Sequence, residues 1–417
     1  MKRWSMGVLI AVLLFSIAVP FFTSSSEAKG PGKKQQFKLG VEVLLEDELK
    51  LLEGKKVGLI TNPTGVNQEL KSIVDIFNEH KAFDLVSLYG PEHGVRGDAQ
   101  AGQHVEFYID QKTGLPVYSL YGPTKKPTPE MLKGVEVLVF DIQDVGTRFY
   151  TYIYTMAYAM EAAKENNIPI VVLDRPNPLG GEKIEGPVLQ AEYASFVGMY
   201  PIPIRHGMTV GELAQLFNQE FNIGADLKVV KMKGWKRSMT AKDLPTEWIA
   251  PSPNMPTADT ALVYPGASLI EGTNVSEGRG TTKPFETIGA PFINGSDLAE
   301  ELNKLALPGV TFRPSYFTPS FSKHSGKLSG GIEIHVSNES TYEPVKTGVA
   351  IVKTIHDLYP DHFAFNAGNK PFFDLLTGNN LVREGIENGK SIQDIVAEWK
   401  PELSEFQKLR KGYLLYK

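Results

Sequence analysis

The sequence contains no cysteine, which excludes disulfide bonds, thiol nucleophiles, thiolate metal sites and a lipid-modified cysteine at a processing site. It also has little excess of charge, because 43 Lys and Arg residues face 48 Asp and Glu residues, for a net charge of −5. A mildly acidic chain with evenly spread charge argues against nucleic acid as a partner. Because no disulfide can form, the stability of the fold has to come from the hydrophobic core.

Two further motifs are missing. The dinucleotide fingerprint G-x-G-x-x-G does not follow the first predicted strand, where the chain reads TNPTG, so we expect no nicotinamide or flavin. No HExxH or comparable spacing predicts a metal site, and we expect no cofactor. The N-terminal apolar run from Gly7 to Phe22 is short for a membrane span and is broken by Ser16 and Pro20, which argues against stable membrane insertion.

The first 28 residues are predicted to be a signal peptide. Lys2 and Arg3 precede the apolar run, and small residues at Ser26 and Ala28 suit a cleavage site. Residues 29–37 read as a flexible leader. We therefore expect a secreted, extracellular protein, in solution or at the cell wall.

The mature chain reads as α/β, with a Rossmann-like open parallel sheet domain over residues 38–259 and a smaller α+β C-terminal domain over 260–417 that completes a cleft. Apolar runs that predict strands alternate with helical periods, as in βαβ units. The strands are expected at 56–61, 85–89, 117–120, 135–141 and 169–174 and the helices near 44–52, 68–78, 150–166 and 210–217. The proline-rich stretch 250–260 predicts the domain crossing. After it we expect a glycine-rich loop at 264–280, strands at 310–317 and 331–336, and helices at 345–358, 371–376 and 392–399.

Polar residues follow each predicted parallel strand. In an open parallel sheet these positions share one edge, where ligands bind. The group comprises Glu92 and His93 after the second strand, Asp141 and Asp144 after the fourth, and Asp174, Arg175 and Asn177 after the fifth. The alternative is that Asp141, Asp144 and Asp174 cap the helices that follow them.

Glu92 is the leading catalytic candidate, because glutamate is a poor helix cap and Pro91 constrains its position. A glycosidase needs an acid to protonate the leaving oxygen and usually a second carboxylate, for which Asp141 or Asp144 would serve. A competing interpretation is a metal site made by His93, Asp98, His104 and Asp141.

Three other features have both a functional and a structural interpretation. The loop 271–281 contains Arg279, which could clamp a carboxylate, or it is a solvated surface loop. Tyr150, Tyr152 and Tyr154, at every second position, could form a sugar-stacking stripe, but on a helix they would not share a face, so most of them are expected in the core or at a rim. His206 could act as a base, but it reads as a turn histidine before a helix capped by Thr209.

Five segments together resemble a secreted bacterial family of exo-acting β-N-acetylmuramidases. They are LYGPEHGVRGDAQAG, VFDIQDVGTRFYTY, DRPNPLGG, SPNMP and EGTNVSEGRGT. The resemblance implies a Rossmann-like domain and a smaller C-terminal domain with the active cleft between them. It also implies release of terminal non-reducing N-acetylmuramic acid from peptidoglycan fragments, in cell-wall turnover and recycling, with Glu92 as the catalytic glutamate.

This substrate carries a lactyl carboxylate, which calls for a cation. Arg96 and Arg279 are the first candidates because their loops are rich in glycine, followed by Arg148 and Arg175. The residues expected to bind the sugar, in a muropeptide or an amino-sugar disaccharide, are His93, Arg96, Asp98, Arg148, Asp174, Arg175, Asn177, Asn254, Asn274, Glu277 and Arg279. The alternative function is a secreted muropeptide- or sugar-binding protein without turnover.

Overall fold

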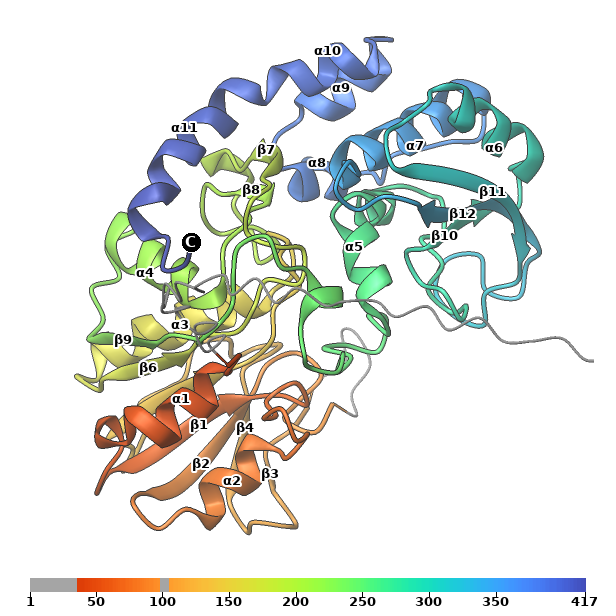
Figure 1. Cartoon of the computed structure of the whole chain (residues 1–417). Coiled ribbons are helices and arrows are strands. Elements are labelled where there is room, and N and C mark those ends of the chain that lie inside the picture. Colours follow the sequence, from red (N-terminus) through yellow and green to blue (C-terminus); the bar gives the residue numbers. More distant parts are fainter. Residues whose placement is uncertain (1–35, 98–104) are drawn as a thin grey trace, which may run out of the picture. The chain divides into compact units, whose positions relative to one another are not determined.

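In the computed structural model, which describes residues 36–97 and 105–417, the first half of the chain builds a seven-stranded sheet (Figure 1). Its spatial order is β3-β4-β2-β1-β5-β6-β9. The strands are β1 Lys56–Thr61, β2 Asp84–Gly90, β3 Tyr108–Ile109, β4 Pro116–Ser119, β5 Val137–Asp141, β6 Ile170–Leu173 and β9 Leu227–Val230. The five predicted strands are therefore present, and β3 and β9 are additions that the sequence pattern did not reveal.

All pairings in this sheet are parallel except that of β3 with β4. The chain starts in the middle at β1, adds β2 and β4 on one side, and then crosses to β5, β6 and β9 on the other. This is the doubly wound order, and its switch point lies between β1 and β5. The predicted α/β class is confirmed, and the switch point marks the expected ligand crevice.

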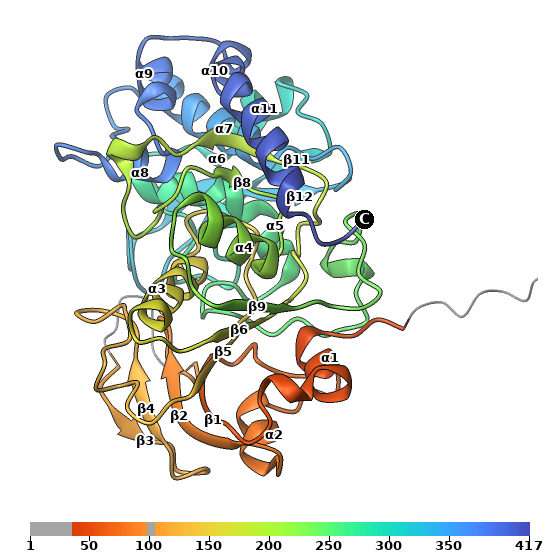
Figure 2. The same ribbon diagram turned by 90° about the vertical axis from the view of Figure 1, so that its left-hand side faces the viewer.

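The sheet is covered on both faces, which explains why strand β5 is an unbroken buried apolar run. Figures 1 and 2 show α1 and α2 on one face and α3 and α4 on the other. Val57 and Val137 belong to the core on the first side, and Leu138 and Phe140 to the core on the second. These four helices are α1 Gly40–Asp47, α2 Ile73–Glu79, α3 Tyr152–Glu165 and α4 Val210–Glu220.

Helix α4 begins where the sequence predicts it. The side chain of Thr209 accepts a hydrogen bond from the Glu212 N–H, and the Glu212 carboxylate accepts one from the Thr209 N–H. This reciprocal capping box satisfies two backbone donors that the first helical turn would leave unpaired.

The second half of the chain contains a three-stranded antiparallel sheet in the order β10-β12-β11, packed with helices. The two predicted strands are present here, as are the predicted helices α7, α8 and α10. The elements are α5 Ala258–Ala267, β10 Thr287–Ala290, α6 Gly295–Lys304, β11 Val310–Phe317, β12 Ser329–Val336, α7 Pro344–Leu358, α8 Phe372–Thr377, α9 Leu381–Glu387, α10 Ile392–Glu398 and α11 Lys400–Arg410. A two-stranded sheet of β7 Glu185–Val188 and β8 Pro203–Arg205 lies earlier in the chain.

The prediction of a loop at 264–280 is wrong for its first part, because residues 264–272 are helical. Helix α5 ends at Ala267 and a 3₁₀ helix continues from Ser268 to Gly272. Pro265 and Gly266 resemble a turn signal, but a Cβ on Gly266 would lie 1.9 Å from the Pro344 carbonyl oxygen. The glycine therefore permits α5 and α7 to pack closely, and it does not end the helix.

The C-terminal segment returns to the first half of the chain. The Tyr416 hydroxyl donates to the Asp174 carboxylate at the end of β6 (2.5 Å), and the Leu415 N–H donates to Glu212 on α4 (2.8 Å). The C label in Figure 1 lies beside α4 accordingly. Within the described residues, every helix is too short or too polar to cross a lipid bilayer.

Candidate active site

The loops after β1 and β5 meet at the switch point of the sheet. Thr64 links them, because its hydroxyl donates to Asn62 (2.5 Å) and accepts from the backbone N–H of Gln143 (2.9 Å). Strand β2 is the other neighbour of β1, so the loop that carries Glu92 starts at the same edge. Topology thus brings Glu92 and Asp144 toward one crevice.

Glu92 lies in a tight turn. The Gly94 N–H donates to the Pro91 carbonyl (2.9 Å), and His93 between them is buried with a φ of +75°. This left-handed conformation is rare for a residue other than glycine, costs about 1 kcal/mol or more, and concentrates at functional sites. The half-buried Glu92 is therefore presented by a strained backbone turn.

The charges of Glu92 and Asp144 both act on two tyrosine hydroxyls. Burial raises the pKa of Tyr152 on α3, and the Glu92 and Asp144 carboxylates raise it further. Burial likewise raises the pKa of Tyr264 on α5 well above its usual value, and the charges of Glu271, Glu92 and Asp144 add to this. Because the charges of Glu92 and Asp144 affect the same two hydroxyls, the two carboxylates share one electrostatic environment. Helix α5, in the second half of the chain, contributes Tyr264 to this environment.

Asp144 is buried beside a histidine. Its Oδ2 accepts a hydrogen bond from the Gly146 N–H (2.7 Å) and lies 3.6 Å from the Nε2 of His206. Its Oδ1 is buried and has no hydrogen-bond partner among the described residues. A buried carboxylate oxygen without a donor is costly, and a molecule bound at this site would supply the donor.

Asp141 has a different environment. It is fully buried and forms a two-point ion pair with Arg175, at 2.5 Å from Nε and 2.8 Å from Nη2. Arg175 also donates to the Val66 carbonyl (2.9 Å). This geometry ties three strand-end loops together, so of the two aspartates proposed as a partner for Glu92 the structure favours Asp144.

Asp174 follows the alternative interpretation, that of a helix-capping residue, and Asn177 holds a turn in the loop after β6. Asp174 accepts hydrogen bonds from the Gly211 N–H, the Thr209 hydroxyl and the Tyr416 hydroxyl. Asn177 accepts from the Leu179 N–H and donates to the Met208 carbonyl. Both side chains hold loops at the sheet edge.

The arginines predicted to clamp the lactyl carboxylate already have partners. Arg96 makes a two-point ion pair with Asp110 (3.0 Å for both contacts). Arg279 lies between Glu271 (3.0 Å) and Glu277 (3.3 Å). Arg148 is fully buried and donates to the carbonyls of Pro187, Ile202 and Leu376, so its role is structural.

The remaining candidates are distributed around this region. Asn274 bonds to the backbone of His362 and Ala364 through its side chain. Glu277 also pairs with Lys323 (3.2 Å). Asn254 is buried in the segment whose Pro251 carbonyl accepts the Tyr152 hydroxyl (2.5 Å). Asp98 and His104 lie outside the described residues, and the described residues contain no group of three potential metal ligands.

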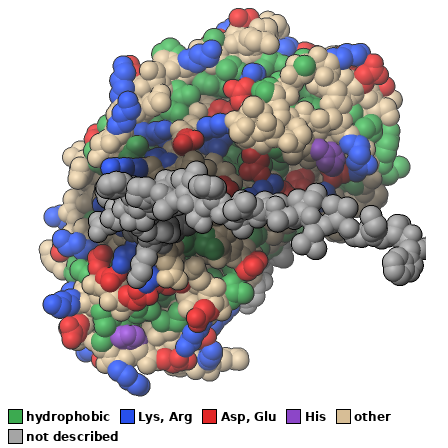
Figure 3. All heavy atoms as spheres, in the orientation of Figure 1, with side chains coloured by type: hydrophobic (Ala, Val, Ile, Leu, Met, Phe, Trp, Pro, Cys, Tyr) green, Lys and Arg blue, Asp and Glu red, His purple; other side chains and the backbone are tan. Residues whose placement is uncertain are grey.

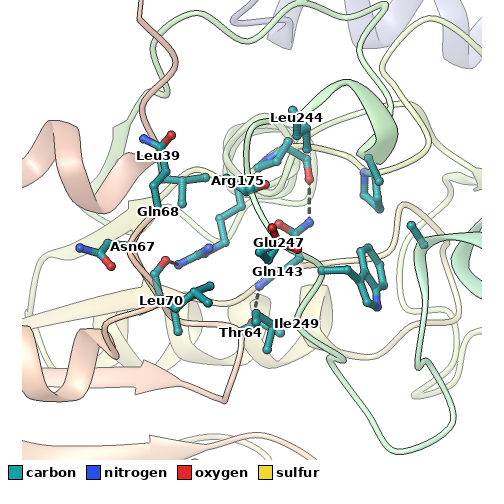
Figure 4. A pocket seen from close by; sticks show the side chains of 17 residues that line it. Leu39, Thr64, Asn67, Gln68, Leu70, Gln143, Arg175, Leu244, Glu247 and Ile249 are labelled. Carbon is teal, nitrogen blue, oxygen red and sulfur yellow. Dashed lines mark hydrogen bonds between the residues drawn. The ribbon is translucent and has the colours of Figure 1, made fainter.

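A small recess adjoins this region at the ends of β1 and β6. Figure 4 shows Asn67, Gln68 and Leu70 along one side of it, with Arg175 reaching between them and Leu244. Gln143 lines it, whereas neither Asp144 nor Glu92 does, so the recess contains neither of the two acids. Figure 3 shows basic and acidic side chains interspersed over the face in view.

The chain is similar to known proteins over nearly its whole length. Models of the exo-β-N-acetylmuramidase NamZ match the chain, the N-terminal model over residues 57–259 and the C-terminal model over 262–416. The chain belongs to this family. It is 58% identical over 416 residues, the full length of both chains, to the peptidoglycan β-N-acetylmuramidase NamZ of Bacillus subtilis strain 168.

Two crystal structures of DUF1343 family proteins from Bacteroides fragilis NCTC 9343 are also similar to the NamZ-family chain. The first is 44% identical with a TM-score of 0.85 and covers 91% of this chain and 99% of its own. The second is 34% identical with a TM-score of 0.71 and covers 92% and 99%. The fold is thus shared over nearly the whole described chain.

Sequence reasoning missed three residues of the site. Tyr264 was assigned to a loop, because α5 has no polar face that would reveal a helical period. His206 was interpreted as a turn histidine, and a lone histidine gives no signal of the aspartate that it faces. Tyr121 follows β4 at the same sheet edge, and its position after a strand was the available clue.

Proposed function

We propose that this NamZ-family chain is an exo-acting glycoside hydrolase that releases terminal, non-reducing, β-linked N-acetylmuramic acid from peptidoglycan fragments. Full-length identity of 58% to a peptidoglycan β-N-acetylmuramidase carries the proposal. The influence of both Glu92 and Asp144 on the pKa of the same two tyrosines, Tyr152 and Tyr264, supports it.

Glu92 acts as the general acid and Asp144 as the second carboxylate. Glu92 gives its proton to the glycosidic oxygen as the bond to the anomeric carbon breaks; a water molecule adds to that carbon, and the proton that it releases goes to the pair of carboxylates, which restores the acid. Asp144 supplies negative charge on the reacting face, where an oxocarbenium-like transition state gains positive charge. The surrounding buried tyrosines lower the local dielectric, which strengthens this stabilisation.

The test compares four proteins on a chromogenic β-N-acetylmuraminide and the matching β-N-acetylglucosaminide. The proteins are the wild type, Glu92→Gln, Asp144→Asn and the control Glu79→Gln, whose carboxylate is exposed on α2 and pairs with Lys71. We expect release from the muraminide by the wild type and the control. General acid catalysis is worth about 10²- to 10⁴-fold, so kcat should fall by that factor in Glu92→Gln while the sugar still binds. Binding without release by the wild type would indicate a sugar-binding protein and contradict the proposal.

We also propose that the enzyme is exported after removal of residues 1–28. The charged and apolar pattern of this segment supports export. N-terminal sequencing of protein from the culture medium and the cell wall should find Lys29 first. Full-length protein confined to the cytoplasm would contradict this proposal.

A further inference from the structure

N-acetylmuramic acid differs from N-acetylglucosamine by an ether-linked lactyl group that ends in a carboxylate. An enzyme that distinguishes the two sugars needs a positive charge that this carboxylate can reach, without a protein carboxylate already on it. Arg96, Arg175 and Arg279 each have an acidic partner, and Arg148 is fully buried. None of these four arginines is an accessible cation without an acidic partner.

The loop after β4 runs beside the loop that carries Glu92. Strands β2 and β4 are parallel neighbours, and the Leu120 N–H donates to the Gly90 carbonyl (2.8 Å) just where both strands end. The next residue, Tyr121, contacts the acid. Burial and then the Glu92 carboxylate, which is also its hydrogen-bond partner, raise the pKa of Tyr121 to about 12.

Four residues further on is Lys125. Its ammonium lies 5.1 Å from the centre of the Phe196 ring and donates to the Gly122 carbonyl (3.3 Å). The Phe196 ring is in turn 6.3 Å from that of Tyr121. These contacts hold the ammonium on the loop that follows β4, beside the loop that carries Glu92, and neither of them neutralises its charge.

The adjacent lysine shows the contrast. Lys126 pairs with Glu165 (2.7 Å) and Glu161 (3.7 Å) on α3. Within residues 36–97 and 105–417, Lys125 has no carboxylate at ion-pair distance. The charge of Lys126 is therefore paired with carboxylates of α3, whereas that of Lys125 can pair with a ligand.

We propose that Lys125 binds the lactyl carboxylate of the sugar and so determines the preference for muramic acid over glucosamine. This proposal rests on the proposed function, for which it names the residue that determines the substrate specificity. Phe196 positions the ammonium, and the aliphatic part of the lysine keeps the charge within reach of a sugar whose glycosidic oxygen meets Glu92.

The experiment measures kcat/KM for the wild type, Lys125→Gln, Lys125→Arg and the control Lys126→Gln. The substrates are the chromogenic muraminide, the same compound with the lactyl acid converted to its amide, and the glucosaminide. A charge-assisted contact is worth about 10- to 100-fold. The wild type and Lys126→Gln should prefer the acid to the amide by that factor, Lys125→Arg should keep most of the preference, and Lys125→Gln should show none. A full acid-over-amide preference in Lys125→Gln would overturn the proposal.

Equilibrium binding of the two free sugars separates this proposal from the proposed function. We expect wild-type protein to bind N-acetylmuramic acid more tightly than N-acetylglucosamine, and Lys125→Gln to bind both alike. If the wild type hydrolyses neither glycoside but this pattern holds, the hydrolase proposal fails and the role of Lys125 stands. Equal binding of both sugars by the wild type would overturn the role of Lys125.

Discussion

The imidazole Nε2 of His206 faces Oδ2 of Asp144 at 3.6 Å, and both side chains are buried. The ring has a defined tautomer, since Nδ1 accepts a hydrogen bond from the Met208 N–H (3.2 Å) and the proton of the neutral ring is therefore on Nε2. His206 thus presents its one N–H to Asp144. We expect it to orient this carboxylate and to stabilise its charge.

Replacement of His206 should separate orientation from packing. His206→Gln keeps an N–H at a similar reach, whereas His206→Leu removes it. We expect kcat to fall about 100-fold in His206→Leu, as for a misplaced catalytic group, with KM little changed and with most of kcat restored in His206→Gln. His335→Leu, on the exposed side of β12, is the control. Equal loss of kcat in the Leu and Gln variants would contradict an orienting role.

Asp141 should affect stability far more than turnover. Asp141→Asn leaves the buried Arg175 guanidinium without its counter-charge, which costs about 3 to 5 kcal/mol in the free energy of unfolding. Urea unfolding measures this loss, and kcat is measured below the unfolding transition. We expect kcat within about tenfold of the wild type, against a loss of at least about 100-fold in Asp144→Asn. A stable but inactive Asp141→Asn protein would reverse the assignment of the two aspartates.

Arg148 should also be a structural residue. Arg148→Met leaves three buried carbonyl oxygens without their donor, and we expect the free energy of unfolding to fall by about 2 to 4 kcal/mol. Lys304→Met, on an exposed helix end, should change it by less than about 0.5 kcal/mol. If Arg148→Met instead weakened sugar binding without loss of stability, the arginine would contact substrate after all.

The Asp174 carboxyl should make stability depend on pH. Burial raises its pKa from 3.8 to about 7, against the opposing hydrogen bonds of Tyr416, Gly211 and Thr209. Between these two values the folded protein binds more protons at this group than the unfolded chain does, so its contribution to stability is complete below about pH 4 and is lost as pH rises through about 7.

The measurement for Asp174 is the free energy of unfolding from urea titrations between pH 4 and pH 8. Asp174→Asn is less stable throughout because it alters the cap of α4, but its stability should fall less steeply with pH than that of the wild type. Glu185, whose pKa burial also raises to about 7, is present in both proteins and cancels in the comparison. Parallel curves for the two proteins would show that Asp174 does not titrate in this range.

Local patterns predicted most of the strands in the two larger sheets. Strand β1 of the seven-stranded sheet and β11 of the three-stranded sheet have the bounds that the sequence indicates. They also predicted that polar groups gather at one sheet edge. They could not distinguish Asp141 from Asp144, because the decisive partner of Asp141 is Arg175, 34 positions away. For the same reason Lys125 and Lys126 look alike in the sequence, and α3 separates them only in the fold.

The return of the C-terminal segment to α4 and β6 has a consequence for biosynthesis. Glu212 and Asp174 receive hydrogen bonds from Leu415 and Tyr416, about 200 or more positions later in the chain. A ribosome that has made the parallel sheet has not yet made these donors. The parallel sheet and α4 therefore lack these two hydrogen bonds until Leu415 and Tyr416 have been synthesised.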